Sequence, residues 1–146
     1  MYAAIFDLKN YFIFSSRIYE NGYKYRIWVV FINNGNLKYK FDSTNGGHTN
    51  DIMVLSSISD GIIASGSTDF TVKIWDLVNG SLKFTFSNEN GGHNNNIIFI
   101  GVLANGNIVT SSTDRSVRAW DQNSGIRVNL FTTNLNSQIV NILSLV

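Results

Sequence analysis

Two copies of one pattern dominate the chain, and the first reads Gly46-Gly47-His48, Ser67-Thr68-Asp69, Trp75-Asp76 and Asn79-Gly80. The second copy reads Gly91-Gly92-His93, Ser112-Thr113-Asp114, Trp120-Asp121 and Ser124-Gly125. All four landmarks keep the same shift of 45 residues, without a gap. A period of this length indicates a repeat architecture in which each copy forms one structural unit.

Alternating apolar residues and turn signals predict four strands within the first copy. The expected strands cover residues 51–58, 62–67, 71–75 and 82–86. Asn79-Gly80, between the last two, is a strong hairpin signal. A four-stranded antiparallel meander of about 40–45 residues has the size of one propeller blade. The second copy repeats the pattern, although its last strand, expected over 126–131, is out of phase with its counterpart.

The residues on either side of the two copies look like incomplete versions of the same unit. Trp28 stands in place of the repeated tryptophan, but Val29 follows it instead of an aspartate. The Asn34-Gly35 turn and a strand over 37–41 align with the first copy, whereas the loop before Trp28 is longer. At the other end, residues 139–146 look like the first strand of a further unit.

The spacing of Gly47-His48, Asp69 and Trp75-Asp76, with 27 residues from histidine to tryptophan in both copies, resembles the WD-repeat family. This resemblance implies an all-β fold: a partial WD-repeat β-propeller of about three four-stranded antiparallel blades plus one extra strand. One incomplete propeller domain is expected over 1–146. Its parts are a degenerate blade at 1–45, WD blades at 46–90 and 91–135, and the first strand of a truncated further blade at 136–146.

Three blades and a strand are too few to close a propeller ring, which typically has 4–8 blades. We therefore expect a fragment of a larger propeller, a truncated gene product, or a unit that completes its ring with other copies. Open ends would expose strand edges and apolar blade faces.

The resemblance also implies a hydrogen-bonded network inside each blade. The histidine would bond the mid-repeat aspartate and a strand hydroxyl, and that hydroxyl would meet the indole N–H of the tryptophan. Ser67 is the expected hydroxyl, with Ser65 as the alternative; in the second blade the choice is Ser112 or Thr110. These groups need partners because an unpaired buried polar group costs several kcal/mol. The expected network residues are His48, Ser67, Asp69, Trp75, His93, Ser112, Asp114 and Trp120.

Serine, histidine and aspartate are also the components of a hydrolase triad. Both copies carry the trio at the same spacing, and the chain has no Gly-x-Ser-x-Gly motif, so we favour a structural role. The repeat supplies no further ligands for a metal on His48 or His93. No catalytic residue, cofactor or metal is expected, and Phe12, Phe14 and Trp28 are expected in the core.

Composition excludes several functional classes. The chain has 146 residues, of which 44% are hydrophobic, and its net charge is +1. That charge gives no basic excess for nucleic acid or an acidic membrane. There is no cysteine, and neither a signal peptide nor an apolar run of about 20 residues is evident. We expect an intracellular protein, cytoplasmic or else nuclear, with neither a membrane nor a nucleic acid as partner.

The resemblance implies a non-catalytic protein–protein interaction scaffold or adaptor subunit of a multiprotein complex. The alternatives are a propeller enzyme with its active site at the channel mouth and a truncated, non-functional fragment of a larger WD-repeat protein. Expected partners are other proteins, further propeller blades or another copy of the chain itself. Phe70 and Arg115 are the expected anchors, because exposed aromatics and arginines carry most interface energy. The full expected contact set is Thr49, Asn50, Thr68, Phe70, Asn94, Asn95, Thr113 and Arg115.

Overall fold

The computed structural model describes residues 5–8 and 10–132, which form three antiparallel sheets of four strands each. The first contains β1 (Ile5–Leu8), β2 (Tyr11–Tyr19), β3 (Tyr23–Phe31) and β4 (Leu37–Phe41). The second contains β5 (Ile52–Ser59), β6 (Ile62–Ser67), β7 (Val72–Asp76) and β8 (Ser81–Phe86). The third contains β9 (Ile97–Val102), β10 (Ile108–Ser112), β11 (Ser116–Trp120) and β12 (Arg127–Thr132).

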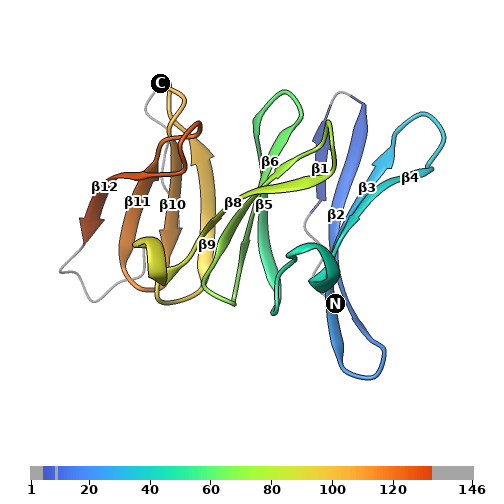
Figure 1. Cartoon of the computed structure of the whole chain (residues 1–146), viewed down its shortest axis with the longest axis horizontal. Coiled ribbons are helices and arrows are strands. Elements are labelled where there is room, and N and C mark those ends of the chain that lie inside the picture. Colours follow the sequence, from blue (N-terminus) through green and yellow to red (C-terminus); the bar gives the residue numbers. More distant parts are fainter. Residues whose placement is uncertain (1–4, 9, 133–146) are drawn as a thin grey trace.

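In every sheet the strands pair in chain order, as in a propeller blade. The sheets stand side by side in a row (Figure 1), with β5 against β1 on one side and against β9 on the other. A short 3-10 helix leads into the second sheet, and another leads into the third; they are η1 (Ser43–Asn45) and η2 (Asn88–Asn90). The predicted all-β fold of four-stranded antiparallel sheets is confirmed.

The core lies between neighbouring sheets rather than within one. One cluster joins the first and second sheets, and its largest members are Phe41 and Trp75. The other joins the second and third sheets and includes Phe86 and Trp120. Because the second sheet is covered on both sides, the side chains of β6 and β7 alternate without an exposed face. Apolar burial between the sheets therefore holds the row together.

The last strand of the third sheet keeps the backbone register of its counterpart, although its apolar residues alternate out of phase with those of β8. Phe131 pairs with Val117 as Phe86 pairs with Val72, which is the same register at a shift of 45 residues. A register irregularity follows at the equivalent place in both ladders. The shifted alternation therefore comes from the residues themselves, because Arg127 and Asn129 occupy the positions of Leu82 and Phe84.

The first sheet corrects the assignment of Trp28. Phe41 pairs with Ile27 and Leu37 with Val30, whereas the second sheet pairs Leu82 with Trp75. Counted from these pairs, the position of the repeated tryptophan belongs to Val30, and Trp28 lies two residues earlier. Trp28 was matched by residue type, whereas the shift of 45 that aligns Asn34-Gly35 with Asn79-Gly80 also gives position 30.

Phe12, Phe14 and Trp28 were expected in the core, and the structure contradicts this. Phe12 pairs with Val30 and Phe14 with Trp28, so these side chains share the face of the first sheet that points away from the second. The opposite face carries the buried Ile13 and its neighbours. Phe12 is 37% exposed, and Phe14 and Trp28 are half-buried.

The extra strand expected over 136–146 lies outside the described residues, and the division of the chain at residues 45, 90 and 135 stays a prediction. Within the described part, no helix is long and apolar enough to cross a membrane.

Candidate functional site

A chain of hydrogen bonds links two strands and two loops of the second sheet: β7, β6, the loop before β5 and the β6–β7 turn. The indole Nε1–H of Trp75 donates to Ser65 Oγ at 2.8 Å, and that hydroxyl lies 2.7 Å from His48 Nε2. His48 Nδ1 lies 2.9 Å from Asp69 Oδ2. With the proton on Nδ1, the imidazole donates to Asp69 and accepts from Ser65, and every group is satisfied by a neutral ring. The structure thus brings His48, Asp69 and Trp75 together.

The hydroxyl in this network is Ser65, and the choice of Ser67 was wrong. Ser67 Oγ instead accepts from the Asp69 backbone N–H at 3.0 Å and donates to the Asn50 carbonyl at 3.2 Å. Both serines share one face of β6, but Trp75 pairs with Ile63, so the next hydroxyl on that face is Ser65. Ser67 lies two residues further along, at the end of the strand, where it holds the Asp69 turn.

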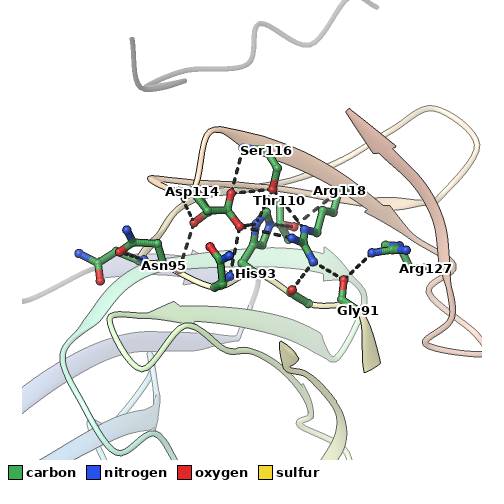
Figure 2. A network of polar contacts seen from close by, with 12 residues as sticks. Gly91, His93, Asn95, Thr110, Asp114, Ser116, Arg118 and Arg127 are labelled. Atoms are coloured by element: carbon green, nitrogen blue, oxygen red, sulfur yellow. Dashed lines mark hydrogen bonds and ion pairs between the residues drawn. The ribbon is translucent and has the colours of Figure 1, made fainter. Parts of the chain in front are cut away.

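The third sheet repeats the network with Thr110 in place of Ser112 (Figure 2). His93 Nδ1 lies 2.9 Å from Asp114 Oδ2, and Thr110 Oγ1 lies 2.8 Å from His93 Nε2 and 3.0 Å from Trp120 Nε1. Ser112 holds the turn, as Ser67 does, by accepting from the Asp114 N–H at 3.0 Å. The alternative hydroxyl was therefore the right one in both sheets.

Arg118 adds a feature that the second sheet lacks. Its guanidinium donates to the carbonyls of Gly91 and Gly92 and lies 3.4 Å from Asp114 Oδ2 (Figure 2). Lys73 occupies the same position in the second sheet and donates to Thr85 instead, at 3.3 Å. The arginine therefore ties the loop before His93 to the middle of the blade, which the repeat pattern alone did not reveal.

Burial and pairing set the protonation of the network. Desolvation lowers the pKa of His48 and of His93, and the neighbouring aspartates only partly oppose this effect. Burial alone would raise the pKa of Asp69, but hydrogen bonds from His48, Thr71 and the Thr49 N–H lower it overall. The network consequently holds neutral imidazoles and ionised carboxylates near neutral pH.

The Ser65, His48 and Asp69 atoms lie within the distances of a catalytic triad, yet they are not arranged for catalysis. Ser65 is fully buried and His48 is 2% exposed, so no substrate can approach the hydroxyl in this structure. The Ser65 oxygen also accepts the Trp75 N–H, and this contact competes with nucleophilic attack. Over the described residues, no three His, Cys, Asp or Glu side chains are grouped so as to hold a metal ion. The geometry is that of an internal brace.

The eight residues predicted to contact a partner gather at one end of the second and third sheets. Four precede β5 or β9, and four lie in the β6–β7 and β10–β11 turns. Six are exposed and two are half-buried: Thr49, Asn50, Phe70, Asn94, Asn95 and Arg115, and then Thr68 and Thr113. Whether they bind a partner stays a prediction.

Phe70 and Arg115 share an unusual backbone conformation. Their φ angles are 70° and 65°, in the left-handed region that favours glycine. Phe70 is 41% exposed and borders a groove of about 620 Å³ whose other wall includes Asn88 and Glu89 of η2. Both turns thus hold a large side chain out from the surface at a position where glycine would be relaxed.

The tip of the β2–β3 hairpin was missed by the sequence interpretation. This hairpin projects beyond the other sheets at the same end as the β6–β7 turn (Figure 1). It carries Tyr19 and Tyr23, which are 74% and 60% exposed and meet edge to face at 5.3 Å. Arg17 lies over the Tyr23 ring and bonds Asp51 of the second sheet at 2.8 Å. In the sequence, the unusual length of the loop before Trp28 was the signal that could have indicated this projecting hairpin.

Solved structures resemble this chain over most of its length. The WD40 β-propeller domain of Doa1 aligns with a TM-score of 0.67 and 26% identity, covering 86% of this chain and 38% of that one. The computationally designed Ika4 protein aligns with a TM-score of 0.68 and 24% identity, covering 86% and 68%. The chain therefore spans well under half the length of the Doa1 domain. No curated protein matches it.

The family described as "WD domain, G-beta repeat" matches at residues 38–76 and 80–121, more than half of the chain. Each match runs from the last strand of one sheet to the motif tryptophan and aspartate of the next, so each spans one joint between sheets. The two hydrogen-bonded networks and the three four-stranded sheets agree with this family match. The chain belongs to the WD40-repeat family of β-propeller proteins.

Proposed function

We propose that this protein is a non-catalytic interaction scaffold or adaptor, and that it holds a partner protein on the end that carries Phe70 and Arg115. WD40 propellers generally mediate protein–protein interaction, which supports the class of function. We also propose that it acts as a subunit of a multiprotein complex inside the cell.

The backbone of Phe70 and Arg115 is the observation that carries the proposal. A non-glycine residue in the left-handed region costs roughly 1–2 kcal/mol. Such strain is retained mainly where the side chain has a use, and it clusters at binding and switch sites. Here the strained positions present an aromatic ring and a guanidinium outward, which are the side chains that most often dominate an interface.

The β2–β3 hairpin extends the same surface. Tyr19 and Tyr23 lie at its tip, and the Arg17–Asp51 ion pair ties it to the second sheet. Tyrosine pairs supply large contact area at little conformational cost. A partner that spans the three sheets would meet the hairpin tip, Phe70 and Arg115 in succession.

Replacing Phe70 by glycine separates binding from folding. Phe70→Gly removes the ring and relieves the backbone, so the fold should keep or gain stability, by up to about 1 kcal/mol. Tagged wild-type chain, Phe70→Gly and Arg115→Ala would be recovered from the native cell, and bound proteins quantified by mass spectrometry. We expect one set of proteins to fall with both variants. Affinity of the purified partner should weaken at least tenfold, which is about 1.4 kcal/mol.

Val78→Ala is the matched control. Val78 is 77% exposed but lies in the β7–β8 turn, at the other end of β7 from Phe70. This variant should recover the same proteins as the wild type. Equal recovery and equal affinity for all three variants would refute the proposed surface.

A further inference from the structure

Each joint between sheets is made of two different faces. The rear face of one sheet meets the front face of the next, where rear means the face toward the sheet that follows in the chain. In the second sheet the rear face carries Ala64, Val72, Ile74, Phe84 and Phe86. The front face of the third sheet packs against it and carries Ile108, Thr110 and Trp120. Phe86 then stacks on Trp120 across the joint at 4.2 Å.

The third sheet has a rear face of the same design. At a shift of 45 residues its members are Val109, Val117, Ala119, Asn129 and Phe131, and the strand register is conserved. These residues line an open depression of about 460 Å³. Phe131 is 56% exposed, whereas its counterpart Phe86 is 1% exposed. This surface is the first half of a joint.

The first sheet has the complementary front face. Its members are Phe12, Phe14, Trp28 and Val30, at the register positions of Ile63, Ser65, Lys73 and Trp75. Phe12 is 37% exposed, whereas Ile63 is 1% exposed. The Trp28 indole donates to Ser16 Oγ at 2.8 Å within its own sheet, so covering this face would leave no indole N–H unpaired.

The two open faces keep the register of the internal ones but carry different side chains at several positions. On the rear face of the third sheet, Ile74 and Phe84 are replaced by the smaller Ala119 and Asn129. On the front face of the first sheet, Ser65 and Ile63 are replaced by the larger Phe14 and Phe12. On the same face Trp28 replaces Lys73 and Val30 replaces Trp75, so its aromatic side chains lie at different positions from those of the internal joints, with the largest apolar rings two residues away from the motif tryptophan position.

The glycines in the turns before the last strands also distinguish the internal joints from the open faces. In the internal joints Tyr39 packs over Gly80 and Phe84 over Gly125, so closely that a Cβ on either glycine would overlap the ring. Gly35 is the equivalent glycine of the first sheet, and no described atom lies within 4 Å of a Cβ built there. The equivalent of Tyr39 and Phe84 in the third sheet is Asn129, on the open rear face.

We propose that two copies of this chain associate head to tail, with the rear face of each third sheet on the front face of the other copy's first sheet. Such a pair contains two identical joints and closes a ring of six sheets, within the typical range of 4–8 blades. Three copies would give nine. Phe131 of one copy then lies against Val30 and Phe12 of the other. This inference is independent of the partner surface proposed above.

Light scattering after size exclusion tests the pair with the chain of 146 residues. The expected mass is twice 16.3 kDa at micromolar concentration. Phe131→Glu and Val30→Lys each place a charge in both joints, and each variant alone should run at the mass of one copy. Circular dichroism would verify that both variants keep their β structure. A wild-type mass of one copy, or a ladder of larger masses, would overturn the closed pair.

Mixing the two variants provides the sharpest measurement. In a mixed pair one joint is native, and the other brings the carboxylate introduced at position 131 beside the ammonium introduced at position 30, so the charges are complementary. We expect equimolar Phe131→Glu and Val30→Lys to recover the two-copy mass in a 1:1 complex. Tyr19→Glu, an equally large change at the exposed hairpin tip, should leave the wild-type pair intact. A mixture that stays at one-copy mass would refute the head-to-tail joint.

Discussion

The ring of Phe86 in β8 lies parallel to the indole of Trp120 in β11, with 4.2 Å between the ring centroids and 6° between the planes. Phe41 and Trp75 repeat this contact one sheet earlier, at 4.4 Å and 21°. Each motif tryptophan therefore has two roles. Its N–H ends the polar network inside its own sheet, and its ring face packs against the preceding sheet.

Phe86 and Trp120 should be energetically coupled. Phe86→Leu and Trp120→Leu keep an apolar side chain but remove the ring stack, whose specific contribution is about 0.5–1.5 kcal/mol beyond the buried area. A double-mutant cycle on the free energy of urea unfolding measures this coupling. Phe86→Leu combined with Val78→Ala, a distant exposed residue, should be additive. Additivity of the Phe86 and Trp120 changes would contradict the stack.

Thr110 should matter through its hydroxyl rather than its shape. Thr110→Val keeps the volume but leaves the Trp120 N–H and His93 Nε2 without a partner, at a cost of roughly 1–3 kcal/mol in unfolding free energy. The Trp120 indole proton should also exchange faster with solvent, as measured by NMR. Ser112→Ala is the matched variant, because it removes the hydrogen bonds to the Asp114 N–H and the Asn95 carbonyl but leaves the contacts of Thr110 in place. If Ser112→Ala moved the Trp120 indole signal and Thr110→Val did not, our assignment of the hydroxyl would fail.

Stability should fall as the pH drops below neutrality. The folded-state pKa of His48 and His93 is lowered, so below about pH 6.5 the unfolded chain binds protons that the native network does not. Their stabilising contribution is complete above that pH and is lost below it, at up to about 1.4 kcal/mol per pH unit for each histidine. Asp69 and Asp114, whose pKa values are also lowered, extend the loss below about pH 4.

Urea midpoints measured from about pH 8 to about pH 4 would follow this effect. The chain contains only these two histidines, so a change between about pH 7 and about pH 5 reports on them. Midpoints that stay constant over that interval would show that the imidazoles are not held neutral.

Gly47 and Gly92 should not tolerate alanine. A Cβ on Gly47 would lie 2.4 Å from the Asp42 backbone carbon, and one on Gly92 would lie 2.5 Å from the Ser87 carbonyl oxygen. Backbone atoms cannot move aside as a side chain can, so each alanine should cost roughly 1–3 kcal/mol in unfolding free energy. Gly101→Ala is the control, since its Cβ would meet only the outer atoms of the Phe99 ring. Similar thermal midpoints for all three variants would contradict the close approach.

The repeat, the strand order and the network members that lie far apart in the chain could all be predicted from the amino-acid sequence. His48, Asp69 and Trp75 could be named because their spacing resembles the WD-repeat family, and that resemblance implies a polar network among them. The strands could be placed because alternation and turn residues act locally. The residues predicted to contact a partner came from the same resemblance, which places them beside the Gly-His pair and the mid-repeat aspartate, and their binding stays a prediction.

The contacts that residues make across strands depend on the folded arrangement. Ser65 and Ser67 lie on the same face of β6, so the alternation of the strand cannot tell which hydroxyl meets the Trp75 indole. The pairing of Trp75 with Ile63 decides this, because it places Ser65 nearer. The strand pairing also gave Val30 the position that had been assigned to Trp28 because of its residue type, although the shift of 45 from the Asn34-Gly35 turn already gives position 30. Phe12 and Phe14 were predicted in the core because they are apolar, but burial depends on whether another sheet covers their face. That depends on the order of sheets in space, which no local pattern encodes.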